Sequence, residues 1–221
     1  MRSLMVIAFL VALATQVIAD DGQPKVHKYA SFISMGAYRP AAPTNWTSIP
    51  DPARSRIIAH LKIRLGEAVY EKLSLVGGQI VDFKALREKE PNSKGYQWEV
   101  PAYNLHLRLR MPEVGIEFYD ASIGCRSDGS VIEEIDLPET AKHPERARFI
   151  ATSRTFEIAK GKGFDTEKSR VELAYRAELG VCVFTFSQLT RREFPMLFYK
   201  CVDIDAHTGN VLKTYESEAI Q

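Results

Sequence analysis

Apolar positions at helical spacing predict two helices. After Asp51-Pro52, apolar residues at 57, 58, 61 and 65 form one stripe. An acidic residue followed by proline favours a helix start at Pro52. A second helix is expected from Pro144, ending at Gly161 and Gly163. Its predicted buried side consists of Ala147, Ile150, Ala151, Ile158 and Ala159.

Two-residue alternation predicts strands in each half of the chain. Between Tyr103 and Met111, apolar side chains alternate with polar ones, which predicts a strand with one solvent-facing side. Residues 171–179 alternate in the same way. Residues 181–186 are expected to form a further strand, and residues 196–204 an antiparallel partner for it.

The chain carries an internal repeat. The segment beginning at Phe118 aligns without a gap to the one beginning at Phe198, so that Gly129 falls on Gly209. Both segments are expected to end in a hairpin whose turn needs glycine. A second match relates the Pro-x-Arg-x-Arg stretches that begin at Pro52 and Pro144. Two sequence matches that occur in the same order in each half of the chain indicate a duplication.

The expected fold class is α+β, with two tandem units that each pack a helix on an antiparallel sheet. The first unit is predicted over residues 51–138 and the second over residues 139–221. Residues 67–95 are interpreted as an extra strand and loop of the first unit. Residues 20–50 are expected to form an extended lead-in.

A short basic start, an apolar run over residues 4–14 and small residues before Asp20 predict a signal peptide at 1–19. The protein is therefore expected to be exported, either periplasmic or secreted, and to have no membrane span. Removing Arg2 leaves 28 basic residues (29 − 1) against 28 acidic ones. Since phosphate binding needs an excess of basic residues, nucleic acid is not an expected partner.

The final hairpin, Val202-Asp203-Ile204-Asp205 with a Thr208-Gly209 turn and Val211-Leu212, resembles PepSY domains. The resemblance implies a cystatin-like fold and an exported, non-catalytic domain that restrains peptidases or binds ligands. It covers the second unit, and it extends to the first through the internal repeat.

The same hairpin offers Asp203, Asp205 and His207 as metal ligands. A calcium loop that begins at Asp203 would require glycine at position 208 and glutamate at position 214, and both are threonine. The other histidines have no recognised zinc spacing. The two aspartates are therefore interpreted as turn residues on a solvated strand face, and neither a metal nor a cofactor is predicted.

His106, Arg108 and Arg110 follow one another on the polar side of the strand over residues 103–111. They are the candidate binding residues, because arginine presents a planar fork of donors to anions. The alternative is that acidic residues across the sheet, such as Glu117 and Asp120, neutralise them.

Three cysteines are present in an expected oxidising compartment. A ladder in which paired residue numbers sum to 383 predicts a disulfide between Cys182 and Cys201. Cys125 then stays free, and it is the single candidate nucleophile for a secreted cysteine hydrolase.

The leading functional hypothesis is an exported, non-enzymatic binding or inhibitory protein. Its partner would be a protein or peptide that meets a sheet edge or the concave sheet face. The alternatives are the Cys125-dependent hydrolase and a structural subunit of an envelope assembly. Oligomeric state does not follow from the sequence.

Overall fold

The computed structural model describes residues 17–18, 24–28, 37–91 and 100–220. The predicted signal peptide lies outside the described residues, apart from Val17 and Ile18. The strands are β1 (Val17–Ile18), β2 (Pro24–Lys28), β3 (Leu73–Ile80), β4 (Tyr103–Met111), β5 (Ile116–Cys125), β6 (Val131–Glu133), β7 (Ser169–Arg176), β8 (Val181–Glu193), β9 (Met196–Asp205) and β10 (Val211–Ile220). The α-helices are α1 (Ala53–Leu65), α2 (Glu67–Tyr70), α3 (Phe83–Lys89) and α5 (Thr152–Gly161), and short 3₁₀ turns cover Trp46–Ser48, Pro112–Val114 and Pro144–Ala147.

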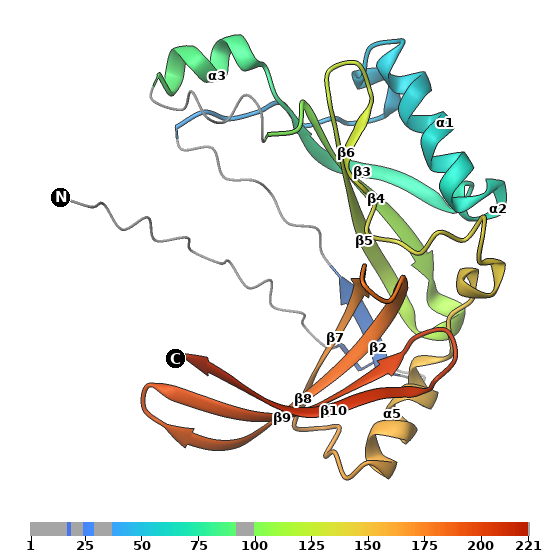
Figure 1. Cartoon of the computed structure of the whole chain (residues 1–221), viewed down its shortest axis with the longest axis vertical. Coiled ribbons are helices and arrows are strands. Elements are labelled where there is room, and N and C mark those ends of the chain that lie inside the picture. Colours follow the sequence, from blue (N-terminus) through green and yellow to red (C-terminus); the bar gives the residue numbers. More distant parts are fainter. Residues whose placement is uncertain (1–16, 19–23, 29–36, 92–99, 221) are drawn as a thin grey trace.

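The α+β class is confirmed, and each half of the chain contains four antiparallel strands that pair in sequence. In the first half α1 precedes the antiparallel strands β3, β4, β5 and β6, each paired with the next. In the second half α5 precedes β7, β8, β9 and β10 in the same arrangement. Figure 1 shows the two groups one above the other, with α1 and α5 on the same outer side of the molecule.

Both predicted hairpin turns are present, and each lies against the helix of its own unit. Gly129 and Gly209 have φ of 83° and 79°, a region that favours glycine. A Cβ on Gly129 would lie 2.5 Å from the carbonyl oxygen of Ala53, the first residue of α1. A Cβ on Gly209 would lie 3.2 Å from side-chain atoms of Ile150 and Ile158. Thus the aligned glycines occupy comparable places.

Helix α1 confirms the predicted stripe, whereas the second helix begins later than expected. Ile57, Leu61 and Leu65 are buried. Pro144–Ala147 forms a separate 3₁₀ turn, and α5 starts at Thr152. Between them the backbone is extended at Arg148, and the Ile150 N–H donates to the Ala206 carbonyl beside the last hairpin, 2.9 Å away.

Two further expectations need correction. Residues 67–95 contain β3 as the predicted extra strand, but α2 and α3 occupy much of the remainder. Helix α3 begins there because the Asp82 carboxylate accepts bonds from the amides of Lys84 and Ala85. Of the lead-in, the structure describes residues 24–28 and 37–50; there β2 pairs in parallel with β5, and Trp46–Ser48 forms a 3₁₀ turn.

Strand β2 connects the two halves. It lies along β5 at residues 116–119 and also beside β7 and α5. The Lys28 ammonium donates to the Tyr119 hydroxyl at 3.1 Å and contacts the Asp136 carboxylate. Tyr119 in turn donates to the Asp136 carbonyl at 2.9 Å. Burial, together with the charge of Asp136 and the nearby Cys182 of the second half, raises the Tyr119 pKa well above its usual value.

One hydrophobic core runs through both units. Ile57 and Leu61 of α1 belong to the same packed cluster as Phe156 of α5 and Phe186 of β8. The rings of Phe156 and Phe186 meet edge to face at 5.0 Å. Helix α5 therefore covers the face of the second sheet that carries Phe186, and the opposite face of that sheet is the one on which the candidate site lies.

Candidate functional site

The face of the second sheet opposite α5 holds a depression of about 200 Å³, here called the outer trough. All four strands of the sheet contribute to its lining, which consists of Arg170, Glu172, Ser187, Tyr199, Ser217 and Ala219. Ser187 lies opposite Arg170 on one side and Cys201 on the other, so these residues share a face. Charged, hydroxyl and aromatic groups thus meet in one open hollow.

A buried carboxylate lies on the same face of the sheet. Asp203 is 3% exposed and accepts bonds from the hydroxyls of Thr185 (2.7 Å) and Tyr215 (3.3 Å). The Lys213 ammonium is 3.3 Å from its second oxygen. Burial and the neighbouring carboxylate raise the pKa of Tyr215 to about 12, so its hydroxyl keeps its proton and donates it. These contacts join β8, β9 and β10 through their side chains.

Cys201 lies between two serines of this face. Its thiol is within 3.4 Å of the Ser187 hydroxyl and 3.3 Å of the Ser217 hydroxyl, and the side chain is buried. The thiol and the two hydroxyls form a polar row across β8, β9 and β10 beneath the trough.

The predicted disulfide between Cys182 and Cys201 is wrong, because all three cysteines are free. Strand β8 continues to Glu193, so the β8–β9 ladder pairs residue numbers that sum to 388 near Cys201, and Ser187 faces it. Cys182 shares its face with Phe184 and Phe186, whereas Cys201 points to the other face. No adjustment of side chains could join thiols on opposite faces of one sheet.

The predicted binding residues His106, Arg108 and Arg110 do not form an open anion site. His106 is 4% exposed, so this side of β4 is not the solvated face that was expected. Arg108 makes two bonds to the Asp120 carboxylate (2.6 and 2.8 Å), which confirms the alternative of neutralisation across the sheet. Its guanidinium also lies 4.2 Å from the centre of the Phe118 ring. Of the three predicted residues, Arg110 alone is exposed.

The last hairpin is a turn closed by its own side chains. The Asp205 carboxylate accepts bonds from the amides of His207 (2.7 Å) and Thr208 (3.1 Å), so it fixes the turn as predicted. The expected solvation is wrong, since both Asp203 and Asp205 are buried. Within the described residues, no three His, Cys, Asp or Glu side chains are grouped closely enough to hold a metal ion.

His207 joins three segments. One ring nitrogen, Nε2, accepts the Cys182 N–H at 3.1 Å, and Nδ1 lies 2.8 Å from the Arg148 carbonyl. Nδ1 must therefore carry the proton and Nε2 must be unprotonated, so the imidazole ring is neutral. Burial, the largest cause, lowers the His207 pKa.

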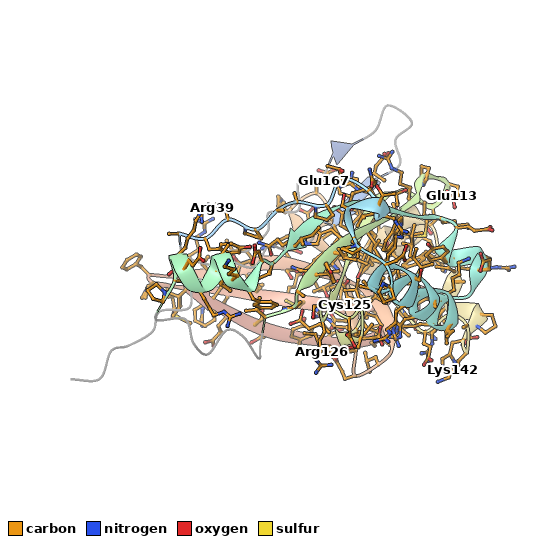
Figure 2. All side chains as sticks on the ribbon, turned by 90° about the horizontal axis from the view of Figure 1, so that it is seen from above. Arg39, Glu113, Cys125, Arg126, Lys142 and Glu167 are labelled. Carbon is orange, nitrogen blue, oxygen red and sulfur yellow. The ribbon has the colours of Figure 1, made fainter. Side chains whose placement is uncertain are left out.

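Cys125 lies in the interior. Figure 2 shows it among crowded side chains, while the adjacent exposed Arg126 lies nearer the margin. Burial, with smaller contributions from Glu134 and Asp128, raises the Cys125 pKa to about 12. Since the thiolate is the nucleophile, this environment disfavours catalysis by Cys125 at neutral pH.

Sequence reasoning missed the outer trough. Its residues come from four strands, and their common position depends on the ladder register, which the predicted β8–β9 pairing placed wrongly. The alternation over residues 171–179 did place Glu172 on a polar face, but nothing in the sequence associated it with Tyr199 or Ser217.

In the part of the chain that the structure describes, no helix is long and apolar enough to cross a membrane. Comparisons with protein-family models, curated proteins and solved structures gave no match to this chain. The PepSY-like relationship therefore stays a prediction, and the site must be interpreted from its own chemistry.

Proposed function

We propose that this chain is an exported, non-enzymatic protein that binds a protein or peptide partner at the outer trough. The observation that carries the proposal is the trough itself, a sheet face that no described helix covers and that combines Arg170 and Glu172 with hydroxyl and aromatic groups. Mixed charge, hydroxyls and an aromatic ring suit a peptide, which presents amides, carbonyls and varied side chains.

The chemistry of the other candidate residues supports binding rather than turnover. Cys125 is buried with a raised pKa, and the Arg108 guanidinium is already paired with a carboxylate. The buried Asp203 is likewise surrounded by donors from its own chain. Asp203 belongs to the sheet that forms the trough, whereas Cys125 and Arg108 belong to the first sheet.

The test begins with peptides selected from a random displayed library on the purified full-length protein. Affinity for the selected peptides is then measured by fluorescence anisotropy for the parent and two tryptophan variants. Ser217→Trp fills the trough and should weaken binding by about tenfold or more. Thr214→Trp, on the same strand but the opposite face, is the matched control and should bind as the parent does.

Equal affinities of the two variants would show that the trough is not the site. If no library peptide binds with a dissociation constant below about 1 mM, peptide binding itself is wrong.

A further inference from the structure

Strand β10 presents a free sheet edge. It is the last strand of the order β10-β9-β8-β7, and among the described strands it pairs with β9 alone. The pairing is regular from Lys213 to Ile220, so one row of backbone N–H and C=O groups faces away from the sheet along most of the strand. Such an edge can take up another extended segment through main-chain hydrogen bonds.

The two faces of β10 differ in chemistry. Ser217 and Ala219 face the outer trough and line it. Glu216 and Glu218 face the other side, because successive side chains of a strand alternate. A strand added to this edge would extend the wall of the trough on one face and place its alternate side chains beside the two glutamates on the other.

The negative charges of Glu216 and Glu218 are not compensated within the described residues. Both side chains are exposed, and neither takes part in an ion pair there. Lys200 occupies the position opposite Glu216 in the ladder, but its ammonium donates to the Gly163 carbonyl at 2.7 Å and lies over the Phe164 ring. The edge therefore offers two negative charges spaced two residues apart.

We propose that the β10 edge binds an extended peptide segment with basic side chains at every second position, directed at Glu216 and Glu218. The inference rests on the proposed function and names the chemistry of its partner. A second copy of β10 is a poorer occupant, since antiparallel self-pairing would put both copies' glutamates on one face.

The first experiment uses a fluorescein-labelled peptide of about eight residues in which lysine alternates with threonine. The parent should bind it, and Glu216→Lys/Glu218→Lys should weaken binding by about tenfold or more. The control is Glu167→Lys/Glu178→Lys, which changes the net charge equally at two exposed positions away from the edge. Equal loss in both double variants would mean unspecific charge attraction and would overturn the proposal.

The second experiment tests strand pairing directly. In an extended peptide all lysine amides point to one edge and all threonine amides to the other. N-methylating the lysine amides in one peptide and the threonine amides in another should therefore abolish binding in one peptide and spare it in the other. Retained binding by both would overturn addition to the β10 edge.

The two proposals fail separately. If the lysine–threonine peptide does not bind while library peptides still lose affinity on Ser217→Trp, the edge inference is wrong and the trough remains the site. If no peptide of any sequence binds, the proposed function is wrong.

Discussion

At the residue scale, Asp203 and Asp205 make different kinds of hydrogen bond although they are only two positions apart. The Asp203 carboxylate accepts two hydroxyl bonds and faces an ammonium, so it needs acceptors on both oxygens. Asp205 uses one oxygen to accept two backbone amides in the turn. An amide side chain keeps one acceptor oxygen and replaces the other with a donor.

We therefore expect Asp203→Asn to lower the free energy of unfolding by about 1–3 kcal/mol, because a donor would face the Lys213 ammonium or a hydroxyl. Asp205→Asn should change it by less than about 0.5 kcal/mol, since asparagine closes such turns as well. Urea denaturation of both variants at neutral pH measures the difference. Equal losses would contradict the separate roles.

His207 predicts how stability changes with pH. Its hydrogen bonds require the neutral ring, and its pKa in the folded protein is lowered, mainly by burial. The unfolded state therefore takes up the proton first. This contribution to stability is complete above the unfolded pKa of about 6.5 and is lost as pH falls from there through the folded pKa.

His207→Gln should cost about 1–2 kcal/mol at pH 8 and should reduce the loss of stability between pH 7 and pH 5. Denaturation curves across that range provide the measurement, with His143→Gln, at a half-buried histidine elsewhere in the chain, as the control for removing an imidazole. An unchanged pH dependence in His207→Gln would exclude this histidine as the cause.

At the scale of elements, the repeated glycine turns show what the internal repeat preserves. Gly129 and Gly209 share a positive φ, but backbone atoms surround the first and side-chain atoms surround the second. A methyl group on Gly129 would meet the backbone of α1, which cannot move without shifting the helix. A methyl group on Gly209 would meet the flexible ends of two isoleucines.

Gly129→Ala should therefore lower the free energy of unfolding more than Gly209→Ala, with about 1–2 kcal/mol expected for the latter from backbone strain. Gly161→Ala is the control, since nothing lies within 4 Å of the added carbon and α5 ends there. It should be neutral or slightly stabilising. Thermal denaturation of the three variants gives the order, and the reverse order would contradict the contact with α1.

The elements that the sequence predicted well are those with a strong period. The apolar residues of α1 and β4 follow their helix and strand periods, and both elements form where expected. The other features depend on pairing between strands that are far apart in the sequence. Strand β2, with the sequence PKVHK, carries no strand pattern of its own and forms beside β5. The β8–β9 register depends on a turn at Phe194-Pro195, which the sequence alone did not locate, and the disulfide and the trough depend on that register.

At the scale of the whole molecule, the tandem units share one core. Tyr119 of the first sheet reaches Cys182 of the second, and α1 and α5 contribute to the same apolar cluster. Because the core is continuous, unfolding of one unit would expose apolar surface of the other. This favours a single unfolding transition. Both tryptophans, Trp46 and Trp98, precede the second unit in the sequence, and Trp46 packs against the shared core, so fluorescence reports on a part of the chain outside the second unit.

Phe186→Ala, a change in the second unit, should lower the free energy of unfolding by about 3–5 kcal/mol. Because the core is shared, the guanidinium midpoint should fall equally by tryptophan fluorescence, which reports on residues before the second unit, and by far-ultraviolet circular dichroism, which reports on the whole chain. Phe194→Ala is the matched control, since that ring is 90% exposed at the β8–β9 turn and its removal should leave the midpoint unchanged. A fluorescence midpoint that stays at the parent's value in Phe186→Ala would mean that the residues around the tryptophans unfold independently of the second unit.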